Sequence, residues 1–112
     1  SRRPGSRKDL PMAIKMRILQ TYDMAHEQEF LVLEKKFTAL EKRCCEFPKG
    51  VRYKPIASAL PTNTLIWECE FPTLDAAQQA LKLFERNPQH EALASQQRKY
   101  FQSVRIEFLE KL

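Results

Sequence analysis

Residues 64–71, with the sequence TLIWECEF, alternate between two sets of side chains. The first set is largely apolar and consists of Leu65, Trp67, Cys69 and Phe71. The second set lies on the opposite face of an extended chain and consists of Ile66, Glu68 and Glu70. A period of two residues predicts a half-buried strand with the first set against a core. The pattern leaves open what the second face, with its two glutamates, contacts.

The same alternation predicts three further strands, and a period of three to four residues predicts the helices between them. The predicted strands span residues 12–22, 51–60, 64–71 and 103–112. A first helix is predicted within residues 23–47, where apolar residues recur at helical spacing at Phe30, Leu33, Phe37, Leu40 and Cys44. A second is predicted to begin after Thr73 and to restart after Asn87, where Pro88 suits the first helical position.

Three residues mark predicted ends of these elements. Asp23 is a candidate N-cap for the first helix, because its carboxylate can accept from the first free backbone N–H groups. Gly50 is free to adopt a left-handed conformation where that helix ends. Pro55 has no N–H to donate to a ladder, so the strand over residues 51–60 is predicted to lie at a sheet edge.

The order of the elements, β-α-β-β-α-β, is typical of the ferredoxin-like arrangement. We therefore predict an α+β fold in which a four-stranded antiparallel sheet carries its helices on one face. Residues 12–112 are expected to form one domain of this kind. Residues 1–11 contain two prolines and no apolar periodicity, so we expect a flexible basic arm, with Met12 as a candidate natural start.

The face of the sheet without helices is predicted to be mixed in character. Its members are Lys15, Arg17, Leu19, Arg52, Lys54, Ile56, Ile66, Glu68, Glu70, Arg105, Glu107 and Leu109. The aliphatic side chains favour burial, whereas the charged ones need partners if they are buried. Two such sheets stacked face to face satisfy both requirements, so we predict a homodimer that pairs through its sheet faces.

Residues 65–109, LIWECEFPTLDAAQQALKLFERNPQHEALASQQRKYFQSVRIEFL, combine several features in order. They are a strand with a central Trp, a short turn, an Ala-rich helix, an Asn-Pro restart and a closing strand. This combination resembles the dimeric α+β barrel superfamily, which includes NIPSNAP-like and antibiotic-biosynthesis-monooxygenase-like proteins, and the resemblance extends over residues 12–112. Members of this superfamily include cofactor-independent oxygenases, haem-degrading enzymes, isomerases and lyases. The resemblance implies a homodimer that binds a small anionic or aromatic molecule in the barrel, with or without cofactor-independent oxygenase or isomerase-type chemistry.

Six polar residues are candidates for the lining of such a barrel. They are Arg17, Tyr22, His26, Arg52, Glu68 and Arg105. Guanidinium groups bind planar anions well, so the arginines suit a carboxylate or an enolate-like oxyanion. The competing interpretation is that they form structural salt bridges with the glutamates of the same face.

Two aromatic side chains have alternative roles. His26 is the candidate catalytic residue, because an imidazole can transfer protons near neutral pH. The alternative is a solvated histidine at a helix end. Trp67 is predicted to pack in the core, with a pocket wall as its alternative role.

Composition excludes several kinds of site. The chain has two glycines in 112 residues, too few for a Gly-rich phosphate loop or a dinucleotide fingerprint. Cys44, Cys45 and Cys69 show no metal-ligand spacing with each other or with histidine, so we expect reduced thiols and no metal. The spacing of Trp67, Asn63 and the histidines does not match a haem site, and no cofactor is predicted.

The formal net charge of +5 is concentrated in residues 1–11, where four basic residues and one acidic residue give +4 − 1 = +3. The remaining charge of about +2, and a predicted open face without aromatic residues in strands 12–22, 64–71 and 103–112, disfavour nucleic-acid binding. A ferredoxin-like nucleic-acid or protein-interaction module without catalysis is the alternative function. The sequence shows no membrane-span pattern and no secretory signal, so we expect a cytoplasmic protein.

Overall fold

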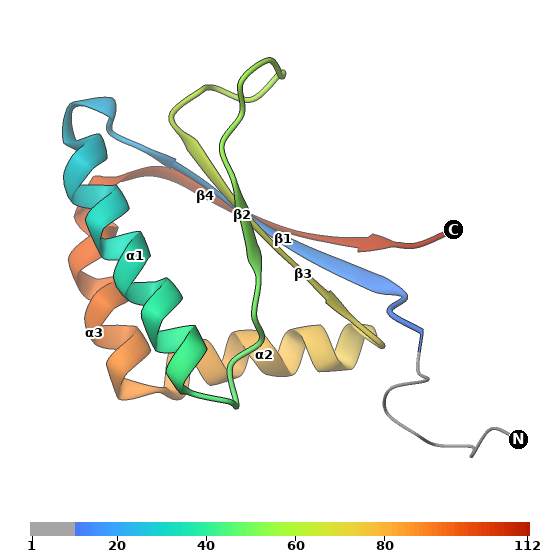
Figure 1. Cartoon of the computed structure of the whole chain (residues 1–112). Coiled ribbons are helices and arrows are strands. Elements are labelled where there is room, and N and C mark those ends of the chain that lie inside the picture. The colour runs from blue at the N-terminus through green and yellow to red at the C-terminus, as the bar shows by residue number, and fades with distance from the viewer. Residues whose placement is uncertain (1–10) are drawn as a thin grey trace, which may run out of the picture.

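The computed structural model describes residues 11–112, and its elements follow the predicted order (Figure 1). The strands are β1 (Ile14–Tyr22), β2 (Val51–Tyr53), β3 (Thr64–Phe71) and β4 (Phe101–Glu110). The helices are η2 (Met24–His26), α1 (Glu27–Arg43), α2 (Leu74–Arg86), α3 (Pro88–Gln97) and η3 (Arg98–Tyr100). The predicted arm, apart from Pro11, lies outside the described residues.

The four strands form one antiparallel sheet in the order β2-β3-β1-β4. Helices α1 and α3 run side by side, and α2 packs against β1 and β3 (Figure 1). This arrangement confirms the predicted ferredoxin-like α+β fold, in which the helices cover one face of the sheet. We call the opposite face, which holds Arg17 and Glu68, the open face.

Side-chain caps begin the helices where the sequence predicted them. The hydroxyl oxygen of Thr73 accepts from the Ala76 N–H at 3.1 Å and starts α2. Asn87 accepts from the backbone N–H of His90 at 3.0 Å and starts α3. Asp23 caps η2, the 3-10 turn that leads directly into α1.

The core lies between the helices and the predicted apolar set of each central strand. One cluster consists of Met16, Trp67, Phe71, Ala77 and Ala80. A second cluster, near the start of α1, consists of Tyr22, Phe30 and Leu65. The alternation in β1 and β3 therefore assigned the buried face of the two central strands correctly.

The outer strand β4 is less buried than its pattern predicted. Its register places Ile106 opposite Ile18 and Phe108 opposite Met16, on the face that carries the helices. Val104, Ile106 and Phe108 are nevertheless 47%, 43% and 38% exposed. The reason is its position, because β4 is an edge strand and the helix α2 packs against β1 and β3 instead.

Strand β2 differs from its prediction in both its length and the face on which its side chains lie. It ends at Tyr53, two residues before Pro55, whereas a strand was predicted as far as residue 60. Arg52 pairs with Trp67 and so faces the helices, although it was predicted on the open face. Val51 and Tyr53 lie on the open face and are 55% and 51% exposed.

Candidate functional site

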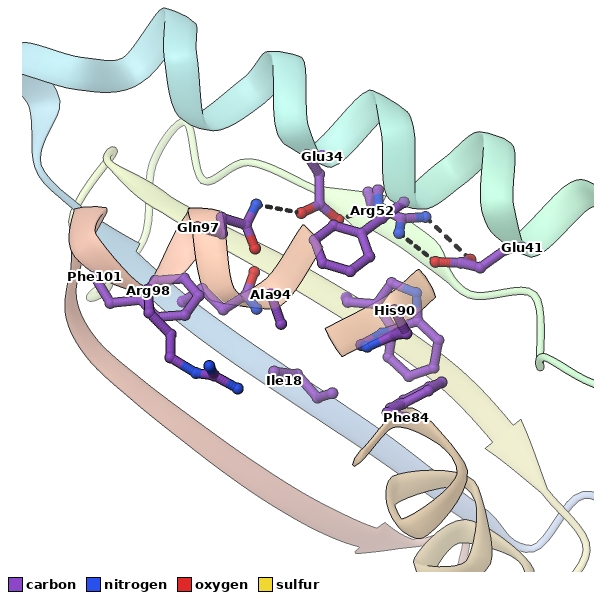
Figure 2. Close-up of a pocket in the computed structure, with 13 residues that line it drawn as sticks. Ile18, Glu34, Glu41, Arg52, Phe84, His90, Ala94, Gln97, Arg98 and Phe101 are labelled. Carbon is purple, nitrogen blue, oxygen red and sulfur yellow. Dashed lines mark hydrogen bonds and ion pairs between the residues drawn. The ribbon is translucent and has the colours of Figure 1, made fainter. Parts of the chain in front are cut away.

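A partly enclosed cavity of about 120 Å³ lies between the helix-bearing face of the sheet and helices α1 and α3 (Figure 2). All four strands and all three α-helices contribute to it. The lining consists of Ile18, Gln20, Glu34, Phe37, Glu41, Arg52, Trp67, Phe84, His90, Ala94, Gln97, Arg98 and Phe101. The cavity thus lies within the described chain itself, whereas the sequence predicted a site between the sheets of two chains.

Two helices supply polar groups to the cavity at the same spacing. Glu34 and Glu41 are seven residues apart on α1, and His90 and Gln97 are seven residues apart on α3. Seven residues are close to two turns, so each pair lies on one helix face. The helices pack together so that Gln97 Nε2 donates to Glu34 Oε1 at 2.9 Å.

Arg52 reaches from β2 to both glutamates of α1. Its Nε donates to Glu34 Oε2 at 2.5 Å, and its two terminal nitrogens donate to the two carboxylate oxygens of Glu41. The Arg52 side chain is 18% exposed, and each glutamate side chain is 10% exposed. Figure 2 shows the guanidinium between the two carboxylates beneath α1. We call Glu34, Glu41, Arg52 and Gln97 the buried polar network.

Two basic groups of the cavity, Arg52 and His90, have pKa values shifted in opposite directions, although burial lowers both. Burial alone lowers the pKa of Arg52, but hydrogen bonds and charges from Glu41 and Glu34 raise it overall, so the guanidinium stays charged. Burial lowers the pKa of His90 below its ordinary value of 6.5, and this effect exceeds the opposing charges of Glu41 and Glu91. At neutral pH the cavity therefore holds a neutral imidazole beside a charged network.

Aromatic rings form much of the remaining wall. His90 and Phe84 lie next to each other in the cavity wall (Figure 2). Their rings are stacked, with centroids 4.7 Å apart and an interplanar angle of 6°. The ring centroids of Phe37 and His90 are 4.8 Å apart. Trp67 contacts Phe84 edge-on, with ring centroids 5.8 Å apart. Trp67 is 5% exposed and belongs to the core cluster, so it both packs in the core and walls the cavity.

Three of the six sequence-predicted site residues, Arg17, Glu68 and Arg105, lie together on the open face, on the opposite side of the sheet from the cavity. Arg17 lies 3.1 Å from Glu68 and 3.5 Å from Glu107, and Arg105 lies 4.0 Å from Glu107. Lys15 adds a contact with Glu68 at 3.2 Å. These groups form a chain of ion pairs across β3, β1 and β4, which matches the structural interpretation of the arginines.

The other three predicted residues lie elsewhere. Tyr22 is fully buried, stacks on Phe30 and donates from its hydroxyl to Glu27 at 2.6 Å. Burial, with that hydrogen bond and the Glu27 charge, raises the pKa of Tyr22. The His26 side chain is 49% exposed and lies 3.3 Å from Glu29. Arg52 faces the cavity on the other side of the sheet, so the six residues do not form one site.

Sequence reasoning missed Glu34, Glu41 and His90 as cavity residues. Both glutamates lie on the buried side of α1. Glu34 directly follows the buried Leu33, and Glu41 directly follows the buried Leu40. A charged residue on a buried helix face is the signal that was available, because such residues are rarely buried without a partner. His90 gave no comparable signal, since only the packing of α3 brings it to Phe84.

The described part of the chain shows little that points to a metal or a reactive thiol. Residues 11–112 contain no group of three or more His, Cys, Asp or Glu side chains placed to hold a metal ion. All three cysteines are free, and burial raises the pKa of the Cys69 thiol to about 11. None of the helices in this range is long and apolar enough to cross a membrane.

No protein-family model matches the sequence, and no curated protein matches it. Solved structures do share its fold. A NIPSNAP family protein from Agrobacterium tumefaciens strain C58 is 13% identical, with 88% of this chain and 85% of that chain covered and a TM-score of 0.72. A dimeric ferredoxin-like protein from an uncultured marine organism is 12% identical, with 96% and 95% covered and a TM-score of 0.67. SnoaB, a cofactor-independent oxygenase from Streptomyces nogalater, is 15% identical, with 90% and 94% covered and a TM-score of 0.62.

These likenesses confirm the predicted resemblance to NIPSNAP-like and antibiotic-biosynthesis-monooxygenase-like proteins at the level of the fold. At such low identity they carry no residue roles over to this chain.

Proposed function

We propose that the protein binds a small aromatic molecule in the cavity between its helices and its sheet. The observation that carries this proposal is the composition of the wall. Aromatic rings of α1, α2 and β3 stand beside the buried polar network. Small-molecule sites typically combine an apolar wall with a few convergent polar groups that fix the orientation of the ligand.

The size of the cavity limits the ligand. Pockets for drug-sized molecules have volumes of roughly 300–1,000 Å³, whereas an apolar cavity of about 150 Å³ is known to hold benzene. The cavity here, at about 120 Å³, is near the second case. A ligand with a single ring and one polar substituent matches this volume.

The proposal includes a homodimer that pairs through the open face. Two apolar side chains of that face, Val51 and Tyr53, are more than half exposed, and Leu109 is 41% exposed. Its charges are balanced, because three basic residues, Lys15, Arg17 and Arg105, accompany three acidic ones, Glu68, Glu70 and Glu107. Five of these six charges have ion-pair partners, and paired charges can be buried against a second copy at less cost than lone charges. A structural neighbour of this chain is itself a dimeric ferredoxin-like protein.

A matched pair of variants tests the cavity as the binding site. Ala94 lines the cavity, whereas Ala92, two residues earlier on α3, is exposed. The chain has one tryptophan, Trp67, and it walls the cavity, so its fluorescence reports ligand entry. Titration with benzyl alcohol, benzylamine and benzoate should change this fluorescence saturably for at least one compound. Ala94→Leu should abolish the change, and Ala92→Leu should leave it intact.

Two results would refute the cavity as a binding site. One is an unmutated protein that none of the three compounds affects. The other is binding that Ala94→Leu leaves unaltered while the variant remains folded.

A second candidate function is proton transfer, with His90 as the proton acceptor, and it would give isomerase-type chemistry. The neutral imidazole in the cavity favours this function, because a base must be unprotonated at the working pH. A bound ketone such as acetophenone should then exchange its α-hydrogens with D2O, which NMR detects. His90→Phe should remove the exchange, and His26→Gln, at the exposed histidine, should not. Equal exchange rates with His90→Phe would rule out this role.

A further inference from the structure

We infer that the ligand of the cavity is a small organic cation, namely an aromatic amine bound as its ammonium ion. The inference rests on the proposed function, because it names the chemical class that the same cavity accepts. Three independent features of the wall support it: the balance of charge, the rings, and the supply of hydrogen-bond acceptors.

The charged groups of the buried polar network do not balance. Glu34 and Glu41 carry two negative charges against one positive charge on Arg52, which gives +1 − 2 = −1. The other cationic lining residue, Arg98, is matched by Glu91 at 2.8 Å, and its side chain is 56% exposed. An unbalanced charge is costly in a buried site. A cation in the cavity would supply the missing positive charge.

The rings of the wall favour the same sign of charge. Phe37, Trp67 and Phe84 line the cavity. A cation within about 6 Å of an aromatic ring centroid is attracted by the negative face of the ring, and the attraction increases when the cation is desolvated. An anion gains nothing comparable from these rings, since their faces repel it.

The polar groups of the wall mostly offer acceptors. Gln97 is 1% exposed, its nitrogen donates to Glu34, and its amide oxygen points away from that glutamate in Figure 2. A carboxylate has about four acceptor positions, and each glutamate accepts two of the bonds described above. An ammonium group has three donors and no acceptor, so it complements this set.

A carboxylate ligand fits the same wall poorly. Each of the three Arg52 nitrogens already donates to a glutamate oxygen. Three of the five Arg52 N–H groups are thus used, and a bound carboxylate could reach only the remaining two, beside the carboxylates of Glu34 and Glu41. It would also add a second unbalanced negative charge. The cavity therefore favours a cation, whereas the arginines predicted for the barrel lining suggested an anion.

The test compares three ligands of nearly equal size at pH 7.5, namely benzylamine, benzyl alcohol and benzoate. Their dissociation constants are measured by Trp67 fluorescence for the unmutated protein, Glu34→Gln, Glu41→Gln and Glu46→Gln. Glu46 is exposed and lies outside the cavity, so its variant removes the same charge from the surface. We expect benzylamine to bind about tenfold more tightly than benzyl alcohol, with benzoate weakest.

The dissociation constant of benzyl alcohol divided by that of benzylamine should fall toward one in Glu34→Gln and Glu41→Gln. The same ratio should persist in Glu46→Gln. The ratio of two constants is measured on folded protein only, so a loss of stability in a variant does not imitate this result. If either glutamate variant fails to fold, the ratio for the unmutated protein still decides whether the cavity prefers the cation to the neutral compound.

The outcomes separate this inference from the proposed function. Equal or tighter binding of benzyl alcohol or benzoate would overturn the cation while the binding site stands. A preference for benzylamine that both glutamate variants retain would also overturn it. If none of the three compounds binds the unmutated protein, both the proposed function and this inference fail.

Discussion

Trp67 has its position because a glycine lies against its ring. A Cβ atom built on Gly50 would overlap the indole, at Cε2 and Nε1. Gly50 does not have a positive φ, so its role is this close approach and not the left-handed turn that the sequence suggested. The loop between α1 and β2 can therefore cover the ring that walls the cavity.

Gly50→Ala should destabilise the protein by about 1–3 kcal/mol, because the added methyl group must displace either the loop or the indole. Urea unfolding followed by circular dichroism measures the change. Lys49→Ala, at the exposed neighbouring position, serves as the control and should cost little. Equal stability of Gly50→Ala and the unmutated protein would show that the loop does not lie on Trp67.

His90 should make stability depend on pH in the mildly acidic range. Its folded-state pKa is lowered by burial, with a further lowering from Arg52 and opposing effects of Glu41 and Glu91. Below about 6.5 the unfolded chain binds a proton that the folded chain does not, so stability falls as the pH decreases from 6.5. His90→Phe should weaken this fall, whereas His26→Gln should preserve it. Parallel curves for His90→Phe and the unmutated protein from pH 7 to 5 would contradict the burial of this imidazole.

At the scale of elements, β2 is the least supported strand. It has three residues and pairs only with β3. Arg52 joins it to α1 through Glu34 and Glu41, so one side chain links the sheet edge to a helix. The same link forms the polar wall of the cavity, and structural and functional roles therefore coincide in it.

Arg52→Met should destabilise the protein by about 3–5 kcal/mol, because it leaves two buried carboxylates without their partner. The triple variant with Glu34→Gln and Glu41→Gln in addition should recover much of this loss, since no buried charge is then unmatched. Thermal unfolding of the single and triple variants provides the measurement. A single variant as stable as the unmutated protein would mean that the network is solvated in solution.

The elements that were predicted correctly are those with long, regular patterns. The alternation over residues 64–71 and the caps at Thr73 and Asn87 determine their elements locally. Strand β2 was assigned the wrong face because its apolar residues, Val51 and Tyr53, alternate as if they were buried. Arg52 takes the buried side instead, since two carboxylates on a distant helix compensate its desolvation. A partner so distant in sequence cannot be recognised from the pattern of the strand.

The candidate site was harder to predict than the fold for the same reason. The open-face arginines were identifiable from alternation, and the structure pairs them with glutamates there. The cavity depends on the packing of α1 against α3, which joins Glu34 to Gln97 across 63 positions of the sequence. Only the polar residues on apolar helix faces indicated it in advance.

At the scale of the whole molecule, the open face is proposed to join two copies. Glu68→Arg would place a fourth positive charge on that face, next to Lys15 and Arg17, so it should shift the protein from dimer to monomer. Light scattering at micromolar concentration measures the mass, and Glu46→Arg, at an exposed position outside that face, is the control. A monomer mass for the unmutated protein would refute pairing through the sheets, and it would leave the cavity unaffected because every lining residue comes from one chain.

The location of a bound ligand tests the cavity most directly. Nuclear Overhauser effects between the ring protons of benzylamine and the isotope-labelled full chain would show which residues surround it. We predict effects to the Ala94 methyl group and to the rings of Phe84 and Trp67, which line the cavity together. Effects confined to exposed residues such as Tyr53 or Val104, with none to Ala94, would contradict a binding site between the helices and the sheet.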